Sequence, residues 1–186
     1  MSNSDHYKVT PNTSDNEKVR YYFRSIGKGN IFKGVEYSIY DKVFEGKPIY
    51  NLGFGNYDVE NEKIISDTSL DNNGDVYKVF NTVLSTVPLF FKEIPSGIIH
   101  VQGSDDNPVY FDICRATCKK KCTDKCKNGG RRMALYRNFI NKNYFTLSID
   151  YVFGGGIEDN GDTLVENYEP GKFYDTILVY KKNKLI

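Results

Sequence analysis

The chain has 186 residues, of which 39% are hydrophobic and 15% aromatic, so it can bury the core of one domain without disulfide support. Its formal net charge of +1 excludes a uniformly basic or acidic protein. Because no apolar run approaches the roughly 20 residues of a membrane span and the polar start lacks the pattern of a signal peptide, we expect a cytoplasmic protein that does not enter a membrane.

The first part of the chain predicts a short leader followed by strands. Residues 1–17 are polar and predict a flexible leader, whereas residues 18–186 predict a single α+β domain. Three segments are rich in aromatic and β-branched residues and predict an antiparallel meander: 19–26, 31–40 and 49–57. Gly53 and Gly55 in the third segment predict a bulge or a close approach of another backbone segment.

A helix is predicted after residues 71–75, because apolar residues then recur at intervals of three and four up to Phe91. The polar side chains of residues 71–75 are expected to cap this helix. Pro88 removes one backbone hydrogen bond and predicts a kink or a local break, and residues 95–97 are expected to end the helix. The apolar run 98–102 then predicts a buried strand.

The second part of the chain predicts a second helix from Arg131, from the spacing of its apolar residues. A strand near the end of residues 146–153, a polar loop over 157–173 and a last strand over 174–180 are expected to follow. The resulting order, β-β-β-α-β-α-β-β, describes an α+β domain in which two helices cover one face of a largely antiparallel sheet. Ribonuclease H-like folds share the opening of that order.

The four cysteines are spaced four residues apart, at Cys114, Cys118, Cys122 and Cys126. Thiolates are soft ligands and four of them close a tetrahedral site, so the cluster predicts a structural zinc ion. A straight helix would spread these residues over about 18 Å, so the segment is expected to fold back. Disulfides and free thiols stay open as alternatives, although a reducing compartment favours a metal.

Positive charge is concentrated around the cysteines. Residues 114–142 hold ten Lys or Arg and one acid, a net charge of +9, so the rest of the chain carries −8. A nucleic acid or an acidic protein would meet this charge locally. The alternatives are a solvated lysine-rich loop and compensation of the −2 charge of a zinc ion with four thiolates.

A second candidate site combines a strand end with the start of the next helix. Guanidinium groups, a hydroxyl and a helix N-terminus suit a phosphate or carboxylate, although Arg132 and Tyr136 could instead only hold the helix in place. The candidate residues for anion or nucleic-acid binding are Ser104, Lys119, Lys120, Lys121, Arg131, Arg132, Tyr136 and Arg137. The sequence holds no Walker or dinucleotide motif and assigns no catalytic residue.

Several phrases of the sequence resemble one family. They are Gly27-Lys-Gly29-x-Ile31-x-Lys33-x-Val35, Tyr50-Asn-Leu-Gly-Phe-Gly-Asn56, Asp71-Asn-Asn-Gly-Asp75-x-x-Lys78-Val79 with Thr82-Val83, Gly103-Ser104, and Arg132-x-x-Leu135-Tyr136-Arg137-x-x-Ile140. In this order they are similar to a family of small uncharacterised bacterial proteins, domain of unknown function 6934. The resemblance implies no activity. In the family, Gly-Ser leads within a few residues to the Arg-x-x-Leu-Tyr helix, which implies that a cysteine-rich insertion at about residues 109–130 elaborates the family fold here.

Three functions are compatible with these observations. The first is a small binding module that contacts nucleic acid or an acidic partner through a basic, zinc-knuckle-like insertion. The second is a metal-independent nuclease or phosphoryl-transfer enzyme that uses the Arg/Tyr/Ser anion site. The third is a protein-interaction domain without nucleic acid.

Overall fold

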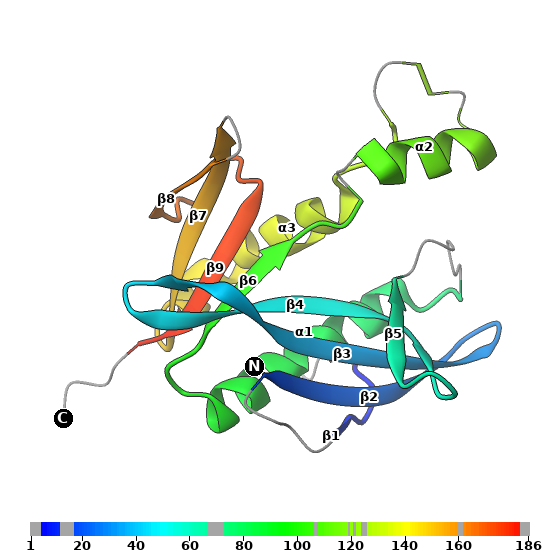
Figure 1. The fold of residues 1–186 in the computed structure, drawn as a ribbon, viewed down its shortest axis with the longest axis horizontal. Helices are drawn as coiled ribbons and strands as arrows, with labels where there is room; N and C mark the ends of the chain where they lie inside the picture. Colours follow the sequence, from blue (N-terminus) through cyan, green and yellow to red (C-terminus); the bar gives the residue numbers. More distant parts are fainter. Residues whose placement is uncertain are drawn as a thin grey trace. The chain divides into compact units, whose positions relative to one another are not determined.

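The computed structural model describes residues 5–11, 17–66, 73–105, 108–118, 120, 122–123, 126–159 and 162–182. These residues form nine strands and three helices, and the chain divides into two compact units, residues 1–99 and 100–186 (Figure 1). The strands pair mostly antiparallel, so the predicted α+β fold is confirmed.

The first unit is built on the predicted meander. Its strands are β1 (Thr10–Pro11), β2 (Lys18–Ile26), β3 (Asn30–Phe44), β4 (Lys47–Asp58) and β5 (Lys63–Ser66), each antiparallel to the one before it (Figure 1). The three expected strands are present. Strands β1 and β5, which are two and four residues long, were not predicted.

Helix α1 (Val76–Glu93) supplies the other side of this unit's core. Alternate residues of β2 are buried, as the two-residue period of a strand requires, and α1 buries one stripe of apolar residues. The ring of Tyr37 stacks on Phe90 with centroids 4.4 Å apart, and its hydroxyl lies 2.7 Å from Thr86 Oγ1. A buried aromatic contact and a buried hydrogen bond thus fix β3 against α1.

Two details of α1 differ from the prediction. A kink or a local break was expected at Pro88, and the helix does not break there, because the buried residues on both sides of the proline hold it together at the cost of one backbone bond. The side chain of Asp75 does not cap the helix. Its Oδ2 accepts hydrogen bonds from Tyr7 and Ser25 instead. Residues 71 and 72 of the expected capping segment lie outside the described residues.

Gly55 confirms the predicted close approach. A β-carbon at this position would lie 2.3 Å from the carbonyl oxygen of Ile65, so a side chain would drive β5 away from β4. Only glycine fits there.

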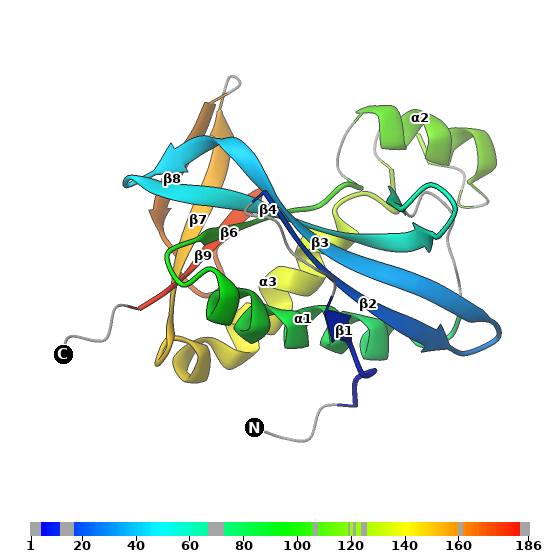
Figure 2. The same cartoon turned by 60° about the horizontal axis from the view of Figure 1, so that its bottom comes forward.

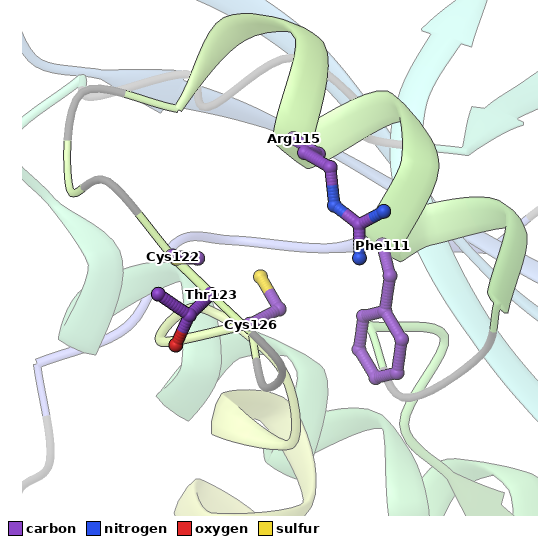
Figure 3. A pocket seen from close by; sticks show the side chains of 5 residues that line it. All are labelled: Phe111, Arg115, Cys122, Thr123 and Cys126. Carbon is purple, nitrogen blue, oxygen red and sulfur yellow. The ribbon is translucent and has the colours of Figure 1, made fainter.

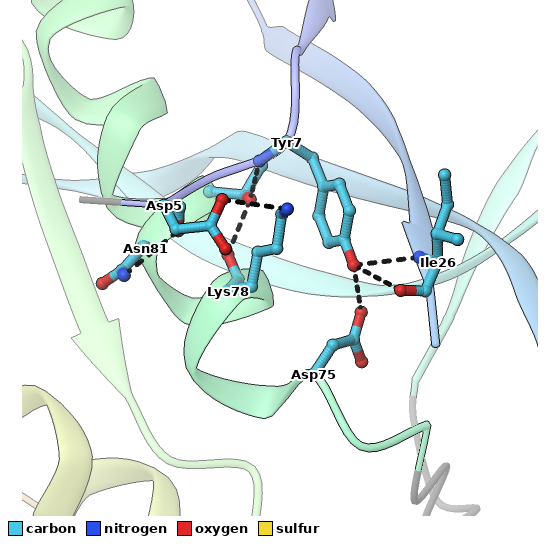
Figure 4. Close-up of polar contacts among 7 residues, drawn as sticks. Asp5, Tyr7, Ile26, Asp75, Lys78 and Asn81 are labelled. Atoms are coloured by element: carbon cyan, nitrogen blue, oxygen red, sulfur yellow. Dashed lines mark hydrogen bonds and ion pairs between the residues drawn. The ribbon is translucent and has the colours of Figure 1, made fainter. Parts of the chain in front are cut away.

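Part of the expected leader is ordered. The hydroxyl of Tyr7 donates a hydrogen bond to Asp75 Oδ2 at 2.8 Å, and its backbone amide donates one to Thr82 Oγ1 at 2.9 Å (Figure 4). Lys78 pairs with Asp5 at 2.9 Å and lies over the ring of Tyr7. Asp5 and Tyr7 are therefore attached to the first turns of α1, while Thr10 and Pro11 pair with β2.

The second unit contains the cysteine segment. Its elements are β6 (Ile98–Gln102), which begins at the boundary of the units, α2 (Pro108–Thr117), α3 (Arg131–Leu147), β7 (Tyr151–Asp159), β8 (Asp162–Asn167) and β9 (Thr176–Lys181) (Figure 2). The strand order is β6-β9-β7-β8, with β7 antiparallel to both of its neighbours. The expected strand at 98–102, the helix from Arg131 and the last strand are confirmed.

Two predictions for this unit are wrong in part. Residues 157–173 are not all loop, because β7 extends to Asp159 and β8 follows it. Two helices were expected, but α2, which carries Cys114, is a third.

The contacts of Tyr144 in α3 are aromatic. Its ring contacts Phe153 of β7 and stacks on Tyr168, which directly follows β8.

Candidate metal centre and basic surface

The four cysteines come together in the second unit. Cys114 lies in α2, Cys118 directly follows that helix, and Cys122 and Cys126 lie in the loop beyond it. All four are free thiols. The sulfurs form two close pairs, Cys114 with Cys126 at 3.4 Å and Cys118 with Cys122 at 3.7 Å. Because α2 ends at Thr117, the segment folds back, as the spacing predicted.

Backbone amides point at three of these sulfurs. The amides of Lys120, Lys127 and Asn128 donate to the sulfurs of Cys118, Cys122 and Cys126 at 3.4, 3.3 and 3.4 Å, respectively. Such donors stabilise the thiolate form, which is the form that binds metal. The amide of Lys127 accordingly lowers the pKa of Cys122.

The side chain of Asn128 contacts the remaining sulfur, that of Cys114, and also the sulfur of Cys118. Its side-chain amide donates to Cys114 at 3.3 Å and to Cys118 at 3.7 Å, and the residue is buried. This amide acts to lower the pKa of Cys114, but the thiol hydrogen bond with Cys126 and burial outweigh it, so the pKa of Cys114 is raised. In the described part of the chain, no three His, Cys, Asp or Glu side chains already have the arrangement of a formed metal site.

Basic side chains surround the thiols. Arg115, Lys120, Lys127 and Arg131 are exposed. The ammonium group of Lys120 donates to Asn128 Oδ1 at 2.6 Å. Because the side chain of Asn128 also contacts Cys114, this lysine is linked to the cysteines through Asn128. Lys119 and Lys121, which the sequence analysis also assigned to this surface, lie outside the described residues.

The predicted anion site is assembled only in part. The guanidinium of Arg132 donates to the hydroxyl of Ser104, so these two predicted residues meet. However, the backbone amide of Arg132 donates to Asp105 Oδ2 at 3.0 Å, and Asp105 is buried. The carboxylate of Asp105 thus occupies the N-terminus of α3, where a bound anion would lie, and it would repel one.

Tyr136 lies near this site, whereas Arg137 makes its contacts elsewhere. Tyr136 is buried, and burial raises the pKa of its hydroxyl, which the charges of Arg132 and Asp105 also influence. The guanidinium of Arg137 donates to the carbonyl of Tyr174 at 2.8 Å and lies over the ring of Phe173, so it holds the segment before β9. Arg131 is exposed at the start of α3.

Asp105 is the residue that the sequence analysis missed. It caps a helix that begins 26 residues later in the chain, and Gly130, the residue before that helix, has no side chain to do so. No local pattern could have indicated this contact, because capping side chains are normally sought within the few residues before a helix.

A hollow opens beside the cysteines. It is lined by Phe111 and Arg115 of α2 and by Cys122, Thr123 and Cys126 of the following loop (Figure 3).

Comparison with known proteins identifies a family but not a function. No curated protein and no solved structure matches the chain. Within the residues that the structure describes, no helix has the length and apolar character needed to cross a membrane. The model of the Family of unknown function (DUF6934) matches residues 3–110, and its match ends before the four cysteines and before α3. Since this match covers more than half of the chain, the protein belongs to the DUF6934 family.

Proposed function

We propose that the protein is a binding module whose cysteine-rich insertion is organised by one structural zinc ion and contacts nucleic acid through its basic side chains. The observation that carries this proposal is the convergence of four thiols, three of which accept backbone amide hydrogen bonds.

Two of the sulfur–sulfur distances are close to those expected around a zinc ion. Four sulfurs at about 2.3 Å from a tetrahedral ion lie about 3.8 Å from one another, and the two close pairs are at 3.4 and 3.7 Å. Binding would draw these two pairs onto one ion. Four thiolates leave no open position for water, so the ion would hold the loop and would not take part in catalysis.

Charge compensation does not account for all of the basic residues. Zinc with four thiolates carries −2, so binding would leave the segment of residues 114–142, with its formal +9, at +7. This surplus favours a polyanion as the partner, because each phosphate that a Lys or Arg contacts releases bound counterions.

The contacts of α3 favour a binding module over an enzyme. An enzyme built on the anion site would need a free helix N-terminus and convergent Arg and Tyr side chains. Asp105 occupies that N-terminus and Arg137 is directed to Tyr174. The Ser104 and Arg132 contact is accounted for by its role in holding the turn against α3.

The test combines metal analysis with binding to labelled oligonucleotides over a series of salt concentrations. We expect one zinc per chain and an affinity that falls steeply with salt. The substitutions Lys127→Ala and Arg131→Ala should each reduce the slope of log K against log salt by about 1, whereas Lys42→Ala, on an exposed part of β3, should leave it unchanged. Metal-free protein, or binding to an acidic protein but to no nucleic acid, would contradict the proposal.

A further inference from the structure

The hollow beside the cysteines combines an aromatic ring with a cation. Phe111 and Arg115 are four residues apart on α2, so their side chains share one face of the helix. That face is directed at the loop that carries Cys122, Thr123 and Cys126 (Figure 3). None of these residues takes part in the predicted anion site.

The ring of Phe111 is held in place by the same loop. A β-carbon on Gly129 would lie 2.7 Å from the ring, so the ring packs directly on this backbone. The amide of Gly129 in turn donates to the carbonyl of Cys126 at 3.0 Å. Phe111 is nevertheless partly exposed. A rigid, partly exposed aromatic ring beside a cation is a stacking surface.

We propose that one unpaired base of a single-stranded nucleic acid binds at the mouth of this hollow. The base would stack on the exposed part of Phe111, and Arg115 would contact the adjoining phosphate or stack on the base. Bases in a duplex cannot stack there, because their faces are already stacked on their neighbours. The site tolerates every base, because each one has a π-face. This inference rests on the proposed function and specifies its substrate as single-stranded.

The test compares a short fluorescein-labelled single strand, as RNA and as DNA, with a duplex of the same length by fluorescence anisotropy. The protein should bind the single strand more tightly. Phe111→Leu removes the π-face and should weaken single-strand binding about 5- to 100-fold, with duplex binding unchanged. Phe111→Tyr keeps an aromatic ring and should retain the affinity. Similar losses of affinity for the RNA and the DNA strand would show that the site recognises the base and not the sugar.

A second measurement does not depend on affinity. The chain contains no tryptophan, so Phe111→Trp introduces a single indole. Its fluorescence should be quenched by the single strand and not by the duplex, provided that the zinc content is that of the original protein.

Three results would overturn the inference. One is a zinc-loaded Phe111→Leu protein that binds the single strand as tightly as the original protein does. The others are equal binding of duplex and single strand, and indole fluorescence that no strand changes. If Lys127→Ala and Arg131→Ala still weaken binding in these cases, the basic surface binds nucleic acid and only the base site is wrong. If the original protein binds no oligonucleotide, both proposals fail.

Discussion

The side-chain amide of Asn128 donates a hydrogen bond to the sulfur of Cys114 at 3.3 Å. The same residue donates its backbone amide to Cys126, and its side-chain oxygen accepts a hydrogen bond from Lys120. Because Lys120 occupies the oxygen, the nitrogen of the side chain is directed at the sulfurs. Asn128 thus orients proposed metal ligands without being a ligand itself.

Replacement of Asn128 should weaken metal binding. Groups that orient metal ligands are typically worth about 10- to 100-fold in affinity, so Asn128→Ala should lower zinc affinity by about that factor. Competition with a chromophoric chelator measures this affinity. Asn138→Ala, at an exposed position of α3, is the matched control. Equal affinities of the two variants would remove Asn128 from the site.

Removal of zinc should make the cysteine segment sensitive to protease. The metal would supply much of the free energy that holds this loop, so chelation should unfold its backbone and let trypsin cleave after its exposed lysines, including Lys120 and Lys127. Limited digestion followed by mass spectrometry reports the cleavage sites, and added zinc should restore protection. Cleavage at the same rate with and without chelator would show that the loop does not need a metal.

Tyr7 should stabilise the first unit. Its hydroxyl donates to Asp75 Oδ2 and accepts a hydrogen bond from the amide of Ile26 at 3.0 Å, and the carbonyl of Ile26, 2.9 Å away, competes for the hydroxyl hydrogen. Tyr7→Phe removes these contacts, and because water can reach Ile26, it should cost about 0.5–1.5 kcal/mol in the free energy of unfolding. Urea denaturation measures this free energy. Tyr77→Phe, on the exposed side of α1, should cost nothing measurable.

The free energy of unfolding of the first unit should depend on pH in the acidic range because of Asp75. Burial raises the pKa of this carboxyl, but the hydrogen bonds from Ser25 and Tyr7 outweigh it and leave the pKa below its usual value. The unfolded chain therefore binds more protons than the folded chain once the pH falls to about 4, the ordinary value for Asp. Asp75 thus adds stability above that pH, and this stability is lost as the pH falls through the lowered pKa.

Denaturation at a series of acidic pH values tests this dependence. Asp75→Asn should be less stable at neutral pH and should lose less of its remaining stability on acidification than the original protein does. Asp41→Asn, at an exposed position of β3, is the control. Parallel pH profiles of the original protein and Asp75→Asn would show that Asp75 is not responsible.

Gly27 and Gly29 should differ in their tolerance of a side chain. A β-carbon at Gly27 would lie 1.9 Å from the carbonyl oxygen of Asn73, which accepts a hydrogen bond from the amide of Lys28. At Gly29 the nearest atom would be at 3.7 Å, an ordinary contact. Gly27→Ala should therefore cost about 3 kcal/mol in the free energy of unfolding, and Gly29→Ala much less. Equal effects on thermal unfolding would contradict this packing.

Local patterns predicted most of the regular structure. The meander follows from its aromatic and β-branched residues, α1 and α3 from the 3.6-residue period of their apolar side chains, and β6 from its short apolar run. β8 gave no such signal, because its residues are mostly exposed and it pairs on one side only, with β7. The side chains of Asp75 and Asp105 have partners far away in the sequence, so no local pattern could assign their roles.

The sequence predicted which residues make up the candidate site, but not the contacts that hold them in place. The spacing and softness of the thiols predicted their convergence, and the charge count predicted the basic surface. The helix that carries Cys114, the amides directed at the sulfurs and the packing of Phe111 on Gly129 depend on the path of the folded loop. The cysteine spacing alone does not determine this path.

X-ray absorption at the zinc edge of freshly purified protein tests the central claim most directly. The proposal predicts one zinc per chain with four sulfur neighbours at about 2.3 Å, and the loss of one sulfur neighbour in Cys122→Ser. Protein without zinc, or a zinc ion surrounded mainly by nitrogen or oxygen, would contradict it.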